Sequence, residues 1–155
     1  MSESDAREPQ SPAQVIILGP GQGRTIPGPA GITLKATSQE TAGAVGFFEA
    51  TSAPKYETSP HIHHDCDELF YVLEGQFRFL VGEQTVSAPA GTFVFIPRGT
   101  VHAAQNSGAE PGKVLAAYIP GGAEQAFEAF AQAPRGQRDR VAEQFNSEFV
   151  SGPRM

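Results

Sequence analysis

The sequence predicts an all-β domain followed by a short helical extension. Between residues 14 and 120, Gly and Pro recur about every eight to twelve residues, and short runs rich in β-branched and aromatic residues lie between them. This spacing is typical of a β-sandwich or β-barrel. After Pro120-Gly121-Gly122 the apolar residues take a helical spacing instead. The 155 residues are enough for one domain with its own core.

The chain is expected to divide into three parts. Residues 1–13 are polar and rich in Ser, Pro, Glu and Gln, which predicts a flexible tail. Residues 14–120 are expected to form the β-barrel domain, and residues 121–155 a helical extension packed on the barrel. The N-terminal stretch lacks the basic start and apolar segment of a secretory signal.

Ten strands are expected in the β-domain, each a short apolar or alternating run between turn residues. In chain order they are Val15–Leu18, Ile32–Ala36, Ala44–Thr51, His61–His63, Glu68–Glu74, Gln76–Val81, Gln84–Ser87, Thr92–Ile96, His102–Asn106 and Lys113–Tyr118. The turn at Val81-Gly82-Glu83-Gln84 favours a hairpin, because Gly supplies the positive φ that such turns require.

Two helices are expected in the extension. The first covers Ala123–Gln132, where Phe127 and Phe130 form an aromatic edge. The second covers Gln137–Phe149, whose apolar residues recur every four positions. The aromatic edge of the first helix is expected to pack on the barrel or to cover the mouth of a pocket.

Composition excludes several classes of function. Seventeen acidic residues against eleven basic ones give a net charge of −6, and no basic cluster offers contacts to phosphate, so we expect no nucleic-acid partner. The longest apolar run, Val15–Leu18, is far too short to cross a membrane. A single cysteine, Cys66, excludes an internal disulfide and fits a reducing compartment. The sequence therefore predicts a cytoplasmic protein.

Three histidines and a glutamate are candidate metal ligands. On a strand, the side chains of His61 and His63 point to the same face. Glu68 opens the next apolar strand, and His102 begins a later one. Three imidazoles and one carboxylate suit a single divalent transition metal ion such as Fe, Mn, Ni, Zn or Cu.

Four other polar residues share this segment. We expect His64 to face solvent or a nearby acid, because His63 takes the inward position. Asp65 and Asp67 are expected in the loop, where either could orient a ligand imidazole through its second ring nitrogen. Cys66 is expected to be an inert small side chain rather than a thiolate ligand.

These residues resemble the two motifs of the cupin superfamily. The first motif is His-x-His, three or four residues, Glu, six residues and Gly, and the second is Gly, five residues, Pro-x-Gly, two residues, His, three residues and Asn. The matching positions are His61, His63, Glu68 and Gly75 in the first, and Gly91, Pro97, Gly99, His102 and Asn106 in the second. Six residues before the first His the family often has Gly, whereas this chain has Lys55.

The resemblance implies a jelly-roll barrel, also called a double-stranded β-helix, with a metal held by His61, His63, Glu68 and His102. The Pro-Gly-Gly segment followed by a Phe-rich helix is similar to single-domain, quercetinase-like cupins. In those relatives the glutamate is a ligand and can act as a base, so Glu68 is the expected catalytic residue. The implied activity is a dioxygenase that acts on a flavonol-like or other enolisable aromatic compound.

The predicted strands carry many phenylalanines and few cations, which favours a mostly apolar pocket for a hydrophobic or aromatic substrate. Phe70 and Val72 share the face of Glu68, and Phe47 or its neighbour Phe48 comes from another strand. We therefore expect Phe70, Val72 and Phe47 near the metal, although ordinary core packing explains them equally well.

Two other functions fit the same residues. A Zn-dependent polyketide cyclase would use the metal as a Lewis acid without redox chemistry. A non-catalytic protein would hold a metal and a small ligand. The family commonly forms dimers, so a homodimer is a further expectation, with Leu69, Tyr71 and Leu73 facing either a partner or other strands of the same chain.

Overall fold

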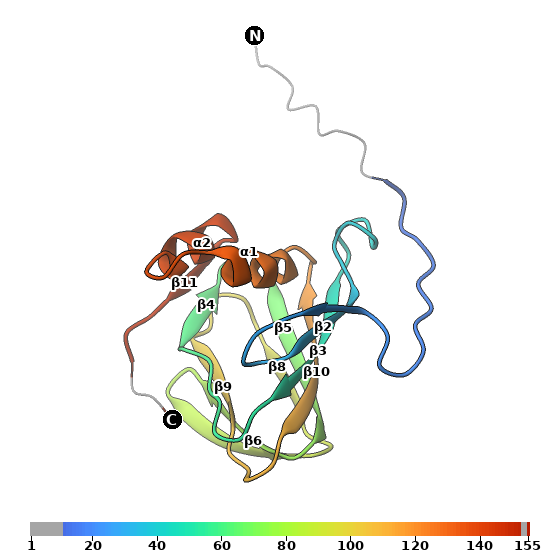
Figure 1. Ribbon diagram of the computed structural model, residues 1–155. Coiled ribbons are helices and arrows are strands. Elements are labelled where there is room, and N and C mark those ends of the chain that lie inside the picture. Colours follow the sequence, from blue (N-terminus) through green and yellow to red (C-terminus); the bar gives the residue numbers. More distant parts are fainter. Residues whose placement is uncertain (1–10, 153–154) are drawn as a thin grey trace.

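The computed structural model describes residues 11–152 and 155, and it has two antiparallel sheets that face each other (Figure 1). The first sheet has six strands in the order β1-β2-β3-β10-β5-β8. These strands are β1 (Arg24–Ile26), β2 (Ile32–Ala36), β3 (Gly46–Ser52), β10 (Gly112–Ile119), β5 (Asp67–Glu74) and β8 (Phe93–Ile96).

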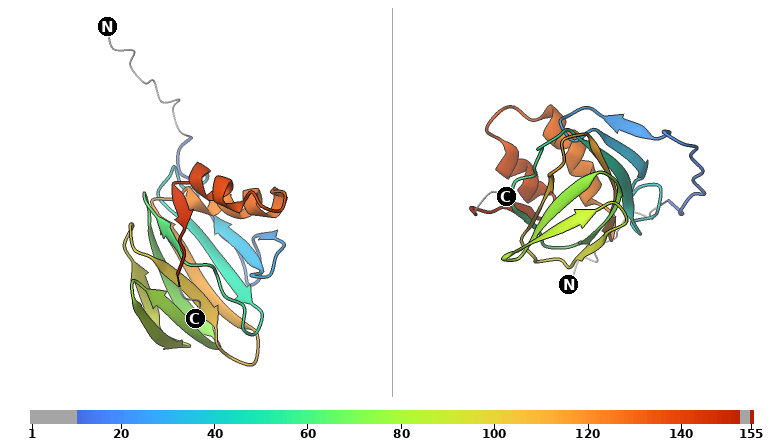
Figure 2. Two further views of the ribbon diagram at one scale, coloured as in Figure 1. Left: turned by 90° about the vertical axis from the view of Figure 1, so that its left-hand side faces the viewer. Right: turned by 90° about the horizontal axis from the view of Figure 1, so that it is seen from below.

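The second sheet has five strands in the order β11-β4-β9-β6-β7. They are β11 (Ser147–Phe149), β4 (His61–His63), β9 (His102–Asn106), β6 (Gln76–Val81) and β7 (Gln84–Pro89). Consecutive strands such as β4 and β5 lie in different sheets, so the chain passes from one sheet to the other. Figure 2 shows how the two sheets curve around a shared interior. Inward side chains from both sheets therefore meet inside the barrel.

Alternating side chains of the facing strands fill the barrel interior. Along β3, Phe48 and Ala50 are buried, whereas Phe47, which points to the opposite face, is only half-buried. From the other sheet, Phe77 and Phe79 of β6 are almost inaccessible to solvent. Because burial of a Phe side chain stabilises a fold by roughly 1.5–3 kcal/mol, these rings are strong links between the sheets.

Three short helical segments follow β10 and cover one end of the barrel (Figure 1). They are η1 (Ala123–Gln125), α1 (Ala126–Gln132) and α2 (Arg138–Gln144). Glu124 fixes the start of this extension: its buried carboxylate accepts hydrogen bonds of 2.6 Å from the backbone N–H groups of Ser38 and Gly122. None of the helices in the described part of the chain has the length and hydropathy that a membrane crossing needs.

The predicted all-β class with a short C-terminal helical extension is confirmed. Each predicted strand from Ile32 onward corresponds to a strand of the structure, with small differences at the ends. The predicted hairpin is also confirmed, since Val81 pairs with Gln84 and Gly82 has a φ of 61°.

The predicted strand at Val15–Leu18 is wrong. These residues have no regular structure, and Val15 and Ile17 are 90% and 87% exposed. An apolar run makes a strand only where a neighbouring backbone is present to pair with it. The edge strand that pairs with β2 is β1, whose sequence has no apolar run and which was not predicted. Of the predicted flexible tail, residues 1–10 lie outside the described part of the chain.

The second predicted helix, Gln137–Phe149, is wrong at its C-terminal end. Helix α2 ends at Gln144, and Asn146 takes the left-handed conformation with a φ of 51°, which no α-helix continues through. The following residues form β11, whose Ser147 pairs with His63 and whose Phe149 pairs with His61. The extension therefore returns to the barrel as a strand beside the histidines of β4.

Candidate metal centre

Four side chains from three strands meet inside the barrel. His61 and His63 come from β4, His102 from β9 and Glu68 from β5. Their potential ligand atoms all lie within 4.8 Å of one another. His61 and His102 are directly opposite each other on paired strands, whereas Glu68 reaches across from the other sheet. The four residues predicted from the sequence thus come together because the two sheets face each other.

The second nitrogen of each imidazole is held by an oxygen atom. His61 Nδ1 lies 2.7 Å from the carbonyl oxygen of Ser59, and His102 Nδ1 lies 2.9 Å from that of Thr100. A carbonyl oxygen only accepts hydrogen bonds, so both Nδ1 atoms carry the proton and donate. In the neutral rings, the Nε2 atoms then carry the lone pairs that a metal requires.

His63 is oriented by the C-terminal extension. Its Nδ1 lies 2.8 Å from Ser147 Oγ of β11. The Ser147 hydroxyl donates its own proton to the carbonyl oxygen of Phe145 at 3.1 Å, so Ser147 Oγ accepts the proton from His63. All three histidines consequently share one tautomer.

The buried atoms of the group fit a cation. His63 Nε2 has no hydrogen-bond partner among the described residues, although it is buried and lies 3.2 Å from Glu68 Oε2. His102 Nε2 lies 2.7 Å from the same carboxylate oxygen. An orphaned buried nitrogen is rare in proteins, and it is expected where a ligand belongs. The residues present therefore suit a divalent metal ion.

Burial and mutual contact shift the pKa values of the group in different directions. Burial, together with the neighbouring His102, lowers the pKa of His61 to about 3. Burial opposes ionisation of Glu68, but contact with His102 and His63 outweighs it and leaves the pKa of Glu68 below its usual value. Burial likewise opposes the charge on His102, and Glu68 reverses this, so the pKa of His102 is raised. Glu68 is therefore ionised and His61 neutral at pH 7.

Tyr118 is a site residue that no sequence motif marked. It is the penultimate residue of β10 and pairs with Glu68 of β5, and its ring centroid lies 5.1 Å from that of His63. Burial raises the pKa of the Tyr118 phenol well above its ordinary value, and the negative charge of Glu68 raises it further. A neutral phenol is thus available as a proton donor beside the carboxylate.

The other polar residues of the segment take separate roles. His64 is exposed, with Nε2 2.9 Å from Glu148 Oε2. Asp67 pairs with Arg98, and Asp65 accepts a hydrogen bond from Asn146, so neither aspartate orients an imidazole as the sequence suggested. The reason is that main-chain carbonyls and Ser147 already occupy the Nδ1 positions.

Cys66 lies outside the group of potential ligands, in agreement with the expectation of an inert side chain. It is buried, and burial, together with nearby acidic residues led by Asp65, raises the pKa of its thiol to about 12. The thiol therefore stays protonated, a state that disfavours metal ligation.

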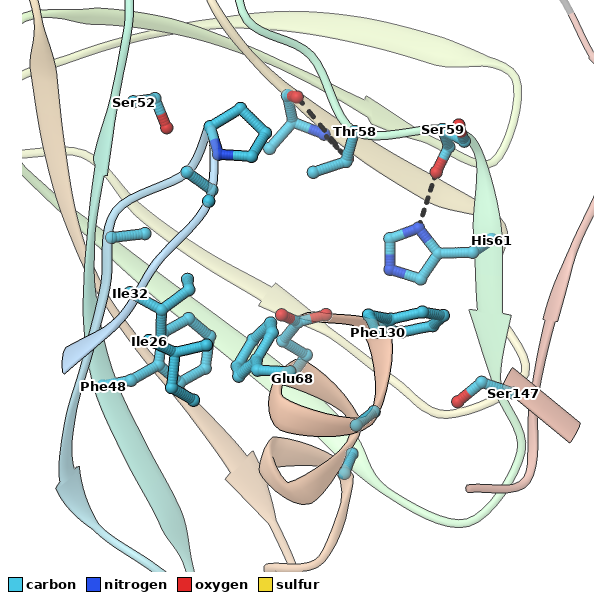
Figure 3. A pocket seen from close by; sticks show the side chains of 18 of the residues that line it. Ile26, Ile32, Phe48, Ser52, Thr58, Ser59, His61, Glu68, Phe130 and Ser147 are labelled. Atoms are coloured by element: carbon cyan, nitrogen blue, oxygen red, sulfur yellow. Dashed lines mark hydrogen bonds between the residues drawn. The ribbon is translucent and has the colours of Figure 1, made fainter. Parts of the chain in front are cut away.

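A cavity of about 760 Å³ opens onto the four side chains. Figure 3 shows His61 and Glu68 pointing into it, with Phe130 close by and Phe48 on the facing wall. Its walls are mostly apolar, and the larger apolar side chains are Ile26, Ile32, Phe48, Phe70, Phe77, Val114, Phe127, Phe130, Phe145 and Phe149.

Of the three predicted pocket residues, one lines the cavity. Phe70 does, whereas Phe47 and Val72 are not among the lining residues. Phe47 is wrong because alternation along β3 turns Phe48 inward instead. Val72 is completely buried in the core, where packing alone accounts for it.

The extension supplies cavity residues that the sequence did not predict as a group. Phe127 and Phe130 of α1 line the cavity, as the pocket-covering alternative for this helix required. Arg138 of α2 and Phe149 of β11 also line it. The sequence predicted few basic residues in the pocket, but that prediction considered the barrel strands only. Arg138 was not included because it belongs to α2.

Part of the chain is similar in sequence to cupin proteins. The family model described as "Cupin domain" matches residues 48–118. Germin-like protein subfamily 2 member 2 from Arabidopsis thaliana is 34% identical over 110 residues, which is 66% of this chain and 50% of that protein. The chain thus spans half the length of this curated relative.

Solved structures show the same fold at low sequence identity. The structure of KdgF from Halomonas sp. aligns with a TM-score of 0.61 and 15% identity, covering 73% of this chain and 98% of that one. An RmlC-like cupin from Shewanella frigidimarina aligns with a TM-score of 0.61 and 18% identity, covering 73% and 96%. The chain therefore has the cupin fold, with a group of three histidines and a glutamate that could hold a metal ion.

Proposed function

We propose that this protein is a metal-dependent cupin enzyme, and that it is a dioxygenase acting on a flavonol-like or other enolisable aromatic molecule. One observation carries the proposal. Three imidazoles with Nδ1 held by oxygen atoms converge with an ionised carboxylate at the wall of a large, mostly apolar cavity. Apolar pockets with a few convergent polar groups are typical of small-molecule sites.

His61, His63, His102 and Glu68 would hold one divalent ion of Fe, Mn, Ni, Zn or Cu. When bound, the metal would supply Lewis acidity and, if it is redox-active, support for chemistry with O2. The similarity to a germin-like protein and to cupin structures supports a cupin enzyme or binding protein, while the finer activity rests on the cavity and the donor set.

The side chains of the chain itself would bind the substrate and move its proton. Glu68 is ionised and buried, so its carboxylate would accept the proton of a substrate hydroxyl group. The neutral phenol of Tyr118 beside it would give a proton to the product, and Glu68 would pass the proton it had accepted to Tyr118, which restores both groups. The apolar walls would hold the aromatic body of the substrate and exclude water, which strengthens each polar contact inside.

A Zn-dependent polyketide cyclase is a second candidate. The pairing of a neutral phenol, Tyr118, with an ionised carboxylate, Glu68, favours it, since such a donor and acceptor serve proton transfer without any redox step. In that reaction the same cavity would hold a polyketide chain, and the same four residues would hold the metal.

Two experiments test the dioxygenase. The full-length protein is purified from its native host for metal analysis, and O2 uptake is measured with quercetin as probe on protein loaded with Fe, Mn, Co, Ni or Cu. The proposal expects O2 consumption that matches the loss of the flavonol absorbance. Absence of O2 uptake with all five metals would overturn the dioxygenase. Full occupancy by Zn in the native protein would favour the cyclase, and tight binding without turnover would favour a non-catalytic protein.

The cytoplasmic location and the homodimer remain predictions. Exposed aromatic residues support the dimer: Tyr71 of β5 pairs with Phe93 of the edge strand β8, and Phe95 follows on the same face. Leu73, from the originally predicted set, is also exposed, whereas Leu69 is half-buried. These residues form an apolar outer face on the six-stranded sheet.

A further inference from the structure

Arg138 places a positive charge at the wall of the apolar cavity. It begins α2 and lines the cavity together with Phe130 and Phe149. Its guanidinium carbon lies 5.5 Å from the ring centroid of Phe130 and 5.2 Å from that of Phe149. Arg138 is exposed, and contacts of this kind restrain the guanidinium group through its faces, so its N–H donors stay available for an anionic group.

No acidic side chain neutralises Arg138 within the described residues. None of the ion pairs found there includes Arg138. Two acidic residues beside it, Glu57 and Glu148, also line the cavity, but Glu148 pairs with His64 and Glu57 accepts a hydrogen bond from Gln105. The charge of Arg138 acts on the cavity wall, because it opposes the rise that burial causes in the pKa of Tyr56. In a chain with a net charge of −6, a cation that has no ion-pair partner among the described residues, at the wall of a mostly apolar cavity, is suited to an anionic group of a ligand.

Phe149 connects this cation to the metal centre. Its ring centroid lies 6.2 Å from that of His61 on one side and 5.2 Å from the Arg138 guanidinium carbon on the other. His61 of the four-residue group and the guanidinium of Arg138 thus both lie against the Phe149 ring. A single small molecule can contact both.

We propose that Arg138 binds a carboxylate of the substrate, so that the substrate is an aromatic acid with a metal-binding hydroxyl group at one end and a carboxylate at the other. The first half of this substrate description rests on the proposed function; the second rests on Arg138 alone. The guanidinium would form a two-point contact with the carboxylate, while Phe130 and Phe149 flank the ring of the substrate.

The test compares a charged probe with a neutral probe of the same shape. Binding of 3,4-dihydroxycinnamate and of its methyl ester is measured by titration calorimetry on the full chain, both loaded with redox-inert Zn and metal-free. The wild-type protein should bind the acid about tenfold more tightly than the ester, the equivalent of one charge-assisted contact near solvent. Arg138→Gln should remove this preference and leave the affinity for the ester unchanged.

Arg140→Gln is the matched control, because Arg140 lies on the same helix, is exposed and does not line the cavity. It should keep the wild-type preference. Equal affinity of the wild-type protein for both probes, failure to bind the acid, or an unchanged preference in Arg138→Gln would each overturn the proposal. The preference is a ratio that needs no turnover, so it stands or falls separately from the O2-uptake test of the proposed function.

Discussion

Single atoms decide what the three histidines can do. Each Nδ1 donates to an oxygen atom, and two of these oxygens belong to carbonyl groups two residues earlier in the chain, at Ser59 and Thr100. This local arrangement needs no distant residue, so the orientations of His61 and His102 follow from the conformation of the chain just before β4 and β9. His63 differs, since its partner Ser147 lies 84 positions further on.

One pair of variants can distinguish a proposed metal ligand, His102, from a nearby histidine that is not a proposed ligand, His64. His102→Ala should weaken metal affinity by more than about a hundredfold, because loss of a ligand exceeds the 10–100-fold effect typical of residues behind the ligands. His64→Ala should leave affinity unchanged, because His64 is exposed and paired with Glu148. Metal content after dialysis measures both. Equal losses in the two variants would contradict the assignment.

The metal-free protein should be most stable near pH 6.5. Burial lowers the pKa of His61 to about 3, so between about pH 6.5 and pH 3 the unfolded chain binds a proton that the folded protein does not. The free energy of unfolding therefore decreases as the pH is lowered from 6.5. The pKa of His102 is raised by Glu68 despite burial, so its stabilisation is complete below about pH 6.5 and is lost as the pH rises through the raised value.

The pKa of Glu68 is lowered overall, because its contacts with His102 and His63 outweigh burial. Its contribution is present above the pKa of an unfolded glutamate and is lost as the pH falls through the folded value, so it does not move the maximum. Thermal unfolding in EDTA from pH 5 to pH 8 measures the curve. With metal bound, stability should instead keep rising above pH 6.5, because protons compete with the metal. A metal-free curve that rises steadily to pH 8 would contradict the pKa shifts.

Residues of the site were predictable where a motif spaces them along the chain. His61, His63, Glu68 and His102 belong to such a pattern, and the structure brings them together. Ser147, Tyr118 and Arg138 follow no pattern, because their contacts depend on how separate strands and helices meet. The choice between Phe47 and Phe48 needed only the register of β3, which turns Phe48 inward.

Among the secondary-structure elements, β11 links the C-terminal extension to the metal centre. It pairs with β4 and places Ser147 against His63. The helical spacing of the sequence continued to Phe149, but Asn146 adopts a left-handed conformation and the backbone beyond it pairs with the edge of β4. Periodicity could not predict this, since the free edge of β4 exists only after the barrel has formed.

Ser147→Ala should reduce metal affinity by about tenfold or more. The variant removes the acceptor that fixes the tautomer of His63, and the loss of such a partner typically costs 10–100-fold in metal affinity. Competition with a chromogenic chelator measures the affinity directly. Ser151→Ala is the control, because Ser151 is exposed and does not line the cavity around the metal centre. Equal affinity of both variants would contradict the role given to β11.

Considered as a whole, the molecule is a barrel whose open end is covered by its own C-terminal extension (Figure 1). Phe127 of α1 packs edge-on against Phe48 of β3 with ring centroids 4.8 Å apart, and Glu128 forms an ion pair with Arg24 of β1. These contacts turn an open barrel mouth into a cavity. The barrel was predictable from spacing and motifs, whereas the cover depends on long-range contacts of this kind.

Gly46→Ala should loosen the cover and destabilise the fold. A methyl group at this position would run into the carboxylate of Glu124, which anchors the start of the extension. Overpacking of this kind costs about 1–3 kcal/mol, which lowers the melting temperature by a few degrees in a chain of this size. Gly152→Ala is the control, since a methyl group there meets no atom within 4 Å. Thermal unfolding of the two variants should differ clearly, and identical melting temperatures would contradict the anchoring role of Glu124.

The central claim is that three imidazoles and one carboxylate hold a metal inside the barrel. X-ray absorption at the Zn edge of the Zn-loaded protein tests it most directly. The account predicts one Zn per chain with nitrogen and oxygen ligands at about 2.0–2.2 Å, the scattering pattern of several imidazole rings, and no sulfur ligand. A sulfur ligand at about 2.3 Å, which would implicate Cys66, or a Zn ion surrounded only by water oxygens, would contradict it.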